Sequence, residues 1–255
     1  MVKYEFNNIK NVHYHFFSAQ RGFSPFPYNS LNCSFKTQDS YENIIKNRKL
    51  IKSMMRLDNL FFVNQIHSNK IFFLEDKQQL SSKLDADGVV TSLKNVGLSI
   101  LTADCAPIFF LDLNNEIVAS CHAGWKGALN GIIENTVEKM IEIGSLRKDI
   151  HAIIGPTIQQ YSYEIGNDLV IKIESTSEYK SKKDILVEKS KKIFFNLPLF
   201  IRNKLNLIKI NNVKDVKINT YLNKNFFSHR RTTQNRKSDD LKSETGRQAS
   251  VIGLR

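Results

Sequence analysis

Two histidines and one cysteine in this 255-residue chain have side chains that together could hold a transition metal. His67, Cys105 and His122 each lie at the end of an apolar, strand-like run, where loops commonly carry function. Three such ligands that leave one position open are typical of a catalytic zinc site. Two histidines with one cysteine also suit copper, so these residue types leave the metal open.

The three cysteines differ in the roles that their surroundings predict. Their odd count and wide spacing argue against a disulfide framework. Cys105 is the candidate ligand, and it could alternatively be the nucleophile of a hydrolase with His122 or His67 as the base. Cys121 precedes His122 in a strand, so the two side chains point to opposite faces and Cys121 is predicted to fill the core. We assign no role to Cys33.

Acidic residues lie close to these candidate ligands in the sequence. Asp104 precedes Cys105, and Asp85 and Asp87 flank Ala86 in a short segment before another apolar run. A carboxylate can orient a metal-binding histidine through its second ring nitrogen. The same acids could equally be turn residues, and the sequence does not separate these interpretations.

A possible anion site follows His122. Residues 124–127, Gly-Trp-Lys-Gly, open a predicted helix, and free amides at a helix start favour an anion such as phosphate. Gly124 and Lys126 are therefore candidate phosphate-binding residues, and the basic side chains of Arg21 and Arg230 could help to clamp the anion.

The apolar spacing predicts an α/β fold, an α+β layered sandwich with a mixed central sheet, in a single domain over residues 1–255. A capping box at Asp39 to Glu42 predicts where the first helix starts, and Gly144 is expected to end the second. The polar segment 232–244 predicts a mobile loop. Predicted helices span 39–55, 126–143, 168–174 and 196–210, and predicted strands span 60–63, 70–74, 88–91, 98–101, 107–111, 117–121, 151–154 and 213–218.

Charge and composition narrow the class of protein. The net charge of +12 comes from scattered lysines, which favours a solvated surface that attracts phosphate over a nucleic-acid partner. No apolar run approaches the roughly 18 residues that a membrane span needs. The first ten residues lack the apolar stretch of a secretory signal. We therefore expect a cytoplasmic protein with no membrane partner, and the sequence does not predict its oligomeric state.

The segments around the candidate ligands resemble a bacterial family known variously as laccase-domain proteins, polyphenol oxidases, peptidoglycan editing factors and purine nucleoside phosphorylases. Thr102-Ala103-Asp104-Cys105 and His122-Ala123-Gly124-Trp125 are its most specific segments. The resemblance covers nearly the whole chain. It includes Ser24 with 28–32, Glu42 with 47–48, 65–67, 87–91, 102–105, 121–125, 154–156, 163–165, 227–231 and 245–247.

The resemblance implies zinc bound by His67, Cys105 and His122 in an α/β sandwich-like fold. It also implies phosphorolysis of adenosine, inosine and S-methyl-5'-thioadenosine, with adenosine deaminase activity in the same site, so the partners are a purine nucleoside and phosphate. This chain departs from the family pattern at four places: Ala19 replaces an arginine, Ser68 a glycine and Ser162 a cysteine, and the tail between Arg231 and Thr245 contains an insertion.

Three other functions fit parts of the sequence. A copper-dependent polyphenol oxidase needs a histidine-rich trinuclear cluster, for which the six histidines are few. A cysteine hydrolase or amidase that edits peptidoglycan precursors would use Cys105 as its nucleophile. A non-enzymatic basic protein would bind nucleic acid with a steep dependence on salt.

Overall fold

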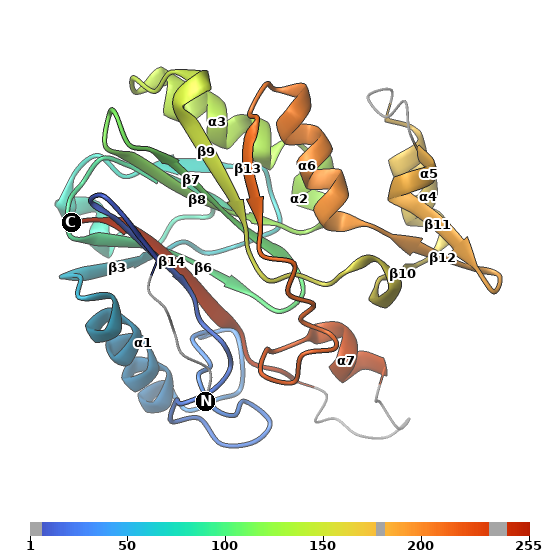
Figure 1. Cartoon of the computed structure of the whole chain (residues 1–255). Helices are drawn as coiled ribbons and strands as arrows, with labels where there is room; N and C mark the ends of the chain where they lie inside the picture. Colours follow the sequence, from blue (N-terminus) through green and yellow to red (C-terminus); the bar gives the residue numbers. More distant parts are fainter. Residues whose placement is uncertain (1–6, 177–181, 235–243) are drawn as a thin grey trace.

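The computed structural model describes residues 7–176, 182–234 and 244–255, which form two mixed sheets packed face to face between layers of helices (Figure 1). The predicted layered α/β fold is therefore confirmed. The strands do not form one central sheet, however, because they divide between the two main sheets and a small third one.

The first sheet has five strands in the order β1-β2-β14-β6-β3. All neighbours are antiparallel except β3 and β6, which run parallel at one edge. The C-terminal strand lies in the middle of the sheet, so the two ends of the chain are paired. The strands are β1 (Asn7–Ile9), β2 (Val12–Phe16), β14 (Gln248–Leu254), β6 (Val96–Thr102) and β3 (Asn59–Phe62).

The second sheet has six strands in the order β13-β9-β7-β8-β5-β4, with parallel pairs at both edges. A separate antiparallel sheet, β10-β12-β11, lies beside the helical layer (Figure 1). The six strands are β13 (Asn212–Asp215), β9 (Ile150–Ile154), β7 (Ala106–Asp112), β8 (Ile117–Ala123), β5 (Gly88–Thr91) and β4 (Ile71–Phe73). The small sheet contains β10 (Glu164–Ile165), β12 (Lys192–Phe195) and β11 (Leu186–Lys189).

Strand β7 shows why the second sheet is buried on both faces. Ile108 and Phe110 belong to the core beneath the helices, whereas Phe109 and Leu111 belong to the core between the sheets. Successive side chains of a strand point to opposite faces, so a continuous apolar run is what a doubly covered strand requires.

The helices cover the outer faces of both sheets (Figure 1). Ile51 and Met55 of α1 pack with Val251 of β14, and the apolar faces of α3 and α6 close the core over β7 and β8. The helices are α1 (Tyr41–Met55), α2 (Trp125–Leu129), α3 (Ile132–Glu142), α4 (Asn167–Glu174), α5 (Lys182–Ile185), α6 (Leu197–Leu207) and α7 (His229–Gln234). The 3-10 helices are η1 (Lys77–Ser81), η2 (Arg147–Asp149) and η3 (Gln160–Ser162).

Several predicted boundaries are wrong. The helix predicted over 126–143 is two helices, because Gly131 has a φ of 95° and interrupts the helical backbone between α2 and α3. The capping box is also wrong, since Ser40 is the N-cap of α1 and makes no side-chain cap bond. The strand predicted over 213–218 ends at Asp215, and Lys217 has a positive φ.

The predicted mobile loop over 232–244 falls mainly on 235–243, which lie outside the described residues. Its first three residues belong to α7. At its far end Glu244 accepts a hydrogen bond from the hydroxyl of Tyr28, so the described part of this segment is tied to the body of the protein at both sides.

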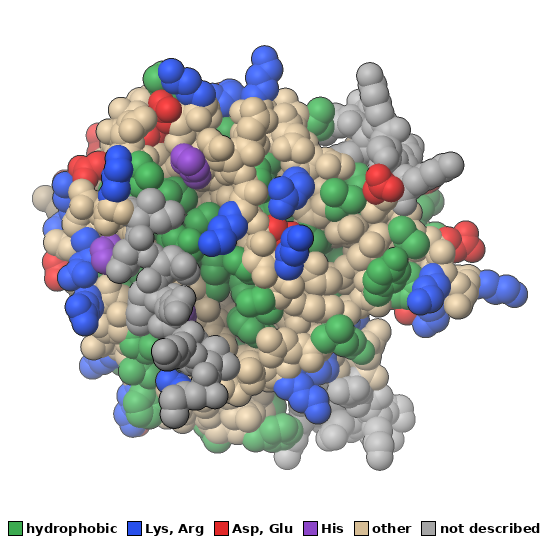
Figure 2. All heavy atoms as spheres, viewed as in Figure 1, with side chains coloured by type: hydrophobic (Ala, Val, Ile, Leu, Met, Phe, Trp, Pro, Cys, Tyr) green, Lys and Arg blue, Asp and Glu red, His purple; other side chains and the backbone are tan. Residues whose placement is uncertain are grey.

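The described surface carries its basic residues at separate positions. On the face drawn in Figure 2, Lys and Arg side chains lie apart from one another over many elements, with apolar side chains between them. Among the helices of the described residues, none is long and apolar enough to cross a membrane.

We expect Gly131→Ala to lower the free energy of unfolding by about 1–2 kcal/mol, because a side chain at φ 95° must adopt a left-handed backbone. Steric overlap adds little, since a Cβ atom there would meet only Glu134 and Asn135 at 3.9–4.0 Å. Denaturant unfolding measures the effect. Gly131→Asn is the control and should lose less, because asparagine tolerates this conformation better than alanine. Equal losses for the two variants would show that the backbone conformation is not the cause.

Candidate metal centre

His67, Cys105 and His122 converge at one end of the two-sheet frame. One ligand atom from each of them lies within 4.8 Å of the others. The antiparallel register pairs Ala106 with Ala123, so Cys105 before β7 lies beside the residues that follow β8. The rings of the two histidines meet edge to face with centroids 4.7 Å apart. Three residues that are distant in sequence thus form one possible metal site.

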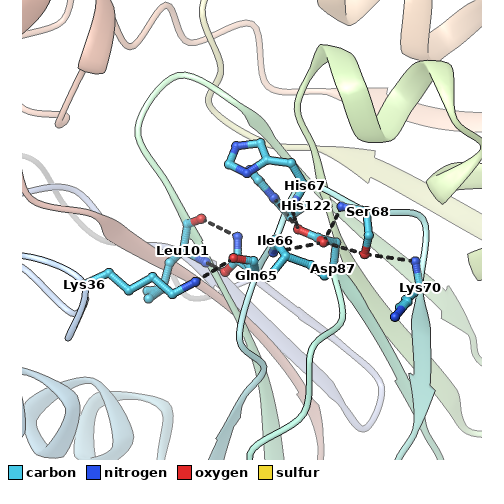
Figure 3. A network of polar contacts seen from close by, with 9 residues as sticks. All are labelled: Lys36, Gln65, Ile66, His67, Ser68, Lys70, Asp87, Leu101 and His122. Atoms are coloured by element: carbon cyan, nitrogen blue, oxygen red, sulfur yellow. Dashed lines mark hydrogen bonds and ion pairs between the residues drawn. The ribbon is translucent and has the colours of Figure 1, made fainter.

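The loop that carries His67 is fixed to the first sheet by Gln65. Its side-chain amide donates to the Leu101 carbonyl and accepts from the Leu101 amide, both at 2.8 Å. Lys36 donates to the Gln65 carbonyl at 2.8 Å. These contacts continue the link between β3 and β6 beyond the end of β3 (Figure 3). They hold the loop whose His67 lies close to Cys105.

A fully buried carboxylate, Asp87, connects two of the three ligands (Figure 3). It accepts from the backbone amides of Ile66, His67 and Ser68 at 3.2, 3.0 and 2.6 Å, and from the Ser68 hydroxyl at 2.8 Å. It also bonds Nδ1 of His122 at 2.9 Å. A carboxylate on Nδ1 fixes the imidazole tautomer and leaves Nε2 as the ligand atom.

The backbone around His67 wraps onto this carboxylate. His67 has a φ of 58°, a left-handed conformation that few residues other than glycine adopt. The turn directs three successive amides toward Asp87 and leaves the His67 side chain exposed. Ser68 contributes a further hydrogen bond to Asp87 through its hydroxyl.

Asp104 has a different role from Asp87. Its carboxylate accepts from Thr220 Oγ1 at 2.7 Å, Ser228 Oγ at 3.0 Å and the Arg230 amide at 2.6 Å. Asp104 thus attaches the segment around Ser228 to the strand end beside Cys105. Its φ of 88° sets the turn that presents this cysteine. The possibility that Asp104 orients a ligand histidine is not what the structure shows.

Gly124 supplies the space that the thiol needs. A Cβ atom at this position would lie 2.8 Å from Cys105 Sγ and 3.4 Å from His67 Cδ2. The glycine therefore lets the first turn of α2 approach the candidate ligands closely. This contact gives Gly124 a steric reason independent of any anion.

Cys105 and His122 each stabilise the charged form of the other. Burial raises the pKa of the Cys105 thiol, but His122 and His67 oppose this and bring it below its usual range. Burial lowers the pKa of His122, whereas Cys105 and Asp87 raise it above its usual range. Burial likewise raises the pKa of Asp87, but hydrogen bonds from His122 and Ser68 bring it to about 2. The site thus favours a thiolate, which is the form that binds metals.

The four predicted phosphate-binding residues differ in their contacts with this centre and in their exposure. Gly124 touches the ligands, and Lys126 is exposed on α2. Arg230 is bound through its backbone to Asp104. Arg21 is exposed, with a φ of 68°.

The family departure at Ala19 is also on this side of the molecule. Ala19 is buried against Phe227 and Ala103, and Ala103 lies two residues before Cys105 in the sequence. The position at which the resemblance predicts an arginine therefore holds a small apolar contact here.

Three residues near the site received no role from sequence reasoning. Gln65 and Arg247 lie in the segments that carry the family resemblance, and so does Tyr163. Nothing in their types or spacing indicated a link to Cys105, because the contacts join strands and loops that are far apart in sequence.

Nearly the whole chain matches one protein family. Residues 13–255 match the family described as multi-copper polyphenol oxidoreductase laccase. The chain belongs to this family. A family member from Rickettsia prowazekii, named purine nucleoside phosphorylase, is 31% identical over 223 residues, which cover 87% of this chain and 89% of that protein.

Two further relatives extend the comparison. A Haemophilus influenzae protein with the same name is 31% identical over 251 residues, 96% of each chain. The crystal structure of the hypothetical protein YfiH from Bacillus licheniformis has a TM-score of 0.87 at 29% identity, covering 96% of this chain and 93% of that one. The family and the mixed α/β fold are thus established by both sequence and structure.

We expect Cys105→Ala to reduce bound metal from about one ion per chain to a trace, because the site loses its only thiolate. Cys121→Ala should keep the metal, since Cys121 points into the core beneath the helices. It should instead lose about 1 kcal/mol of stability. Metal analysis after dialysis and thermal unfolding measure the two effects. Loss of metal from a folded Cys121→Ala protein would contradict the ligand assignment.

We expect Asp87→Asn to weaken metal binding about 10–100-fold, the usual cost of removing a carboxylate behind a ligand histidine. Asp85→Asn is the matched control, because Asp85 is exposed and accepts a bond from Asn64. Competition with a chromophoric chelator measures both affinities. The role of Asp87 would be refuted by equal affinities in the two variants.

Proposed function

We propose that this protein is a zinc-dependent purine nucleoside phosphorylase that acts on adenosine, inosine and S-methyl-5'-thioadenosine, with adenosine deaminase activity in the same site. The observation that carries the proposal is the convergence of His67, Cys105 and His122, backed by Asp87, in a family whose curated members bear the phosphorylase name. Both relatives cited above match this chain over most of their length.

The three converging residues fit a zinc ion in donor type. Two imidazoles and a thiolate are ligands that zinc accepts, and three protein ligands leave a position for substrate or water. When bound, the ion supplies a Lewis acid next to the substrate. His67 is on the exposed side of the site, whereas His122 is buried, so a nucleoside would approach from the side of His67.

The chain's own groups divide the remaining work. Asp87 holds the Nδ1 proton of His122 and keeps the His67 loop in place. Gly124, Lys126, Arg21 and Arg230 are the candidates for binding phosphate that the sequence offers. Phosphate must be held close to the anomeric carbon, where an oxocarbenium-like state develops, and cationic side chains stabilise the negative charge of the nucleophile.

Ala19 predicts a weak phosphate affinity. Relatives usually carry an arginine there, and loss of one charge-assisted hydrogen bond costs about 1.5–3 kcal/mol. That corresponds to roughly a tenfold or greater loss of affinity. The requirement for phosphate is expected to remain, because the other cationic candidates are present.

A copper-dependent polyphenol oxidase, the activity that the family description names, has less support. Within the described residues, which include all six histidines, the only group of three possible metal ligands is the one already described. His13 and His15 are on β2, His151 is on β9 and His229 opens α7. A trinuclear copper cluster would need several of these histidines together.

One observation favours a second candidate, a cysteine hydrolase or amidase that acts on peptidoglycan precursors. Cys105, His122 and Asp87 are arranged as a thiolate, an imidazole and an orienting carboxylate. Such an enzyme would stay active after chelation and would form an acyl-cysteine. The phosphorylase would lose activity with its metal.

The deciding measurement is a nucleoside panel assayed with metal-analysed protein, with and without phosphate. We expect about one zinc per chain, and free base with ribose 1-phosphate from adenosine only when phosphate is present. Chelation should abolish the reaction, and added zinc should restore it. Base release at the same rate without phosphate would show a hydrolase, and inosine as the sole product from adenosine would show that deamination is the main activity.

A further inference from the structure

Three segments from distant parts of the chain meet beside Cys105. Asp104 binds the hydroxyl of Ser228 and the amide of Arg230. Gln248 binds both the amide of Phe227, at 2.8 Å, and its carbonyl, at 3.3 Å. The strand end before Cys105, the start of α7 and the start of β14 are therefore joined by side-chain hydrogen bonds.

The turn before β14 brings a second arginine to this place. Gly246 lies so close to Phe227 that a Cβ atom would meet its ring at 2.6–2.8 Å. Gln248, the first residue of β14, pairs with Thr102, the last residue of β6. Arg247, just before β14, therefore lies at the same end of the sheet as Cys105, which follows β6. Arg247 is partly buried. Burial lowers the pKa of Arg247, while the nearby charges of Cys105, Asp104 and Glu244 raise it.

Arg230 and Arg247 are held in the same manner. Arg247 donates from Nη1 to the carbonyls of Thr245 and Gly246 at 2.7 and 3.0 Å. Arg230 donates from Nη1 to the Glu164 carbonyl at 2.6 Å. In both side chains one end of the guanidinium is anchored on backbone oxygen.

The other edge of each guanidinium lacks a partner among the described residues. For both arginines, side-chain hydrogen bonds among the described residues involve only Nη1, and none of the ion pairs of this part of the chain includes either arginine. The Nε and Nη2 edge presents two parallel donors, which match two oxygens of a phosphate. An anion that accepts from both donors of such an edge would form strong charge-assisted hydrogen bonds.

Other arginines of the chain show what a structural role looks like. Arg231 donates from Nη1 to the carbonyls of Thr220 and Tyr221 and from Nη2 to that of Phe226. Arg48 uses Nε and Nη2 on the Cys33 carbonyl. In these two side chains the Nη2 end is occupied by backbone oxygen, which leaves no complete edge for an anion.

An aromatic ring stabilises Arg230 in its position. Its guanidinium lies 5.2 Å from the centroid of the Tyr163 ring, which itself packs against Phe195. Such a cation–aromatic contact restricts the side chain without using its hydrogen-bond donors. Arg230 is therefore oriented before any ligand binds.

We propose that Arg230 and Arg247 together form the phosphate subsite of this enzyme, on the Asp104 side of Cys105. Their Nε–Nη2 edges, which have no partner among the described residues, would be the oxygen-binding groups. Arg247 is a binding residue that the sequence did not indicate, and Tyr163 is a positioning residue for Arg230. Identification of the anion as phosphate rests on the proposed function. The carboxylate of Asp104 does not compete for these edges, because its oxygens are bound by Thr220, Ser228 and the Arg230 backbone.

The test compares zinc-loaded wild type with Arg247→Gln, Arg247→Lys and Arg230→Gln. With saturating adenosine and varied phosphate, we expect each variant to raise the KM for phosphate at least tenfold, which corresponds to about 1.4 kcal/mol. Zinc content should stay near one per chain and the KM for adenosine should change less than twofold. Arg247→Lys should resemble Arg247→Gln, because lysine keeps the charge and loses the two-donor edge.

Arg202→Gln is the matched control, since Arg202 contacts the Val213 carbonyl at a distance from the site. Arg21→Gln and Lys126→Gln test the competing assignment. An unchanged KM for phosphate in both Arg230→Gln and Arg247→Gln would overturn the proposal. A large rise in Arg21→Gln or Lys126→Gln alone would do the same.

A binding measurement separates this inference from the proposed function. Inorganic phosphate is titrated into zinc-loaded protein by calorimetry, without nucleoside. One outcome is that wild type binds phosphate without cleaving nucleosides, and that Arg247→Gln no longer binds phosphate. The proposed activity would then be wrong and the proposed subsite right. If wild type requires phosphate for cleavage and both arginine variants bind it normally, the activity is right and the subsite is wrong. If Arg247→Gln or Arg230→Gln fails to fold, the lysine variant at the same position replaces it, because lysine keeps the cationic side chain but loses the two-donor edge.

Discussion

The candidate site depends on one buried carboxylate. Asp87 is fully buried, and its negative charge is stabilised by five hydrogen bonds from the His67 loop and the His122 ring. Removal of a charge from water costs several kcal/mol unless hydrogen bonds compensate it. The loop and the ring supply that compensation, and in return both are held in fixed orientations. The left-handed backbone of His67 is tolerated because these contacts determine it.

The two-sheet frame converts this local arrangement into a site. Strands β7 and β8 pair so that Cys105 and Gly124 meet just beyond the ends of the paired region. Side chains of β8 alternate between the two cores, which places Cys121 beneath the helices and turns His122 toward Asp87. Adjacent residues therefore serve packing and chemistry without interference.

Charge around the centre is arranged in two parts. Asp87 and the thiolate of Cys105 form the negative side that favours a cation between the histidines. Beyond Asp104, Arg230 and Arg247 keep donors for an anion. A metal and a phosphate placed side by side would stabilise each other's charge in a partly water-excluded site.

The sequence by itself determined the layered α/β class, seven of the eight strands that it predicted to within two residues, and the three candidate ligands. It did not predict β1, β2, β10, β11, β12 or β14. Apolar periodicity and strand-end placement are local properties, so they can be read along the chain. The sequence did not separate Asp87 from Asp85 and Asp104, because all three are acids next to strand ends. Only the tertiary structure decided between them, since it shows which carboxylate is buried behind His122. The division of the strands between two sheets and the position of Arg247 were likewise decided by pairing between distant segments. Gln248 pairs with Thr102, which lies more than a hundred positions away, and no local pattern encodes that contact.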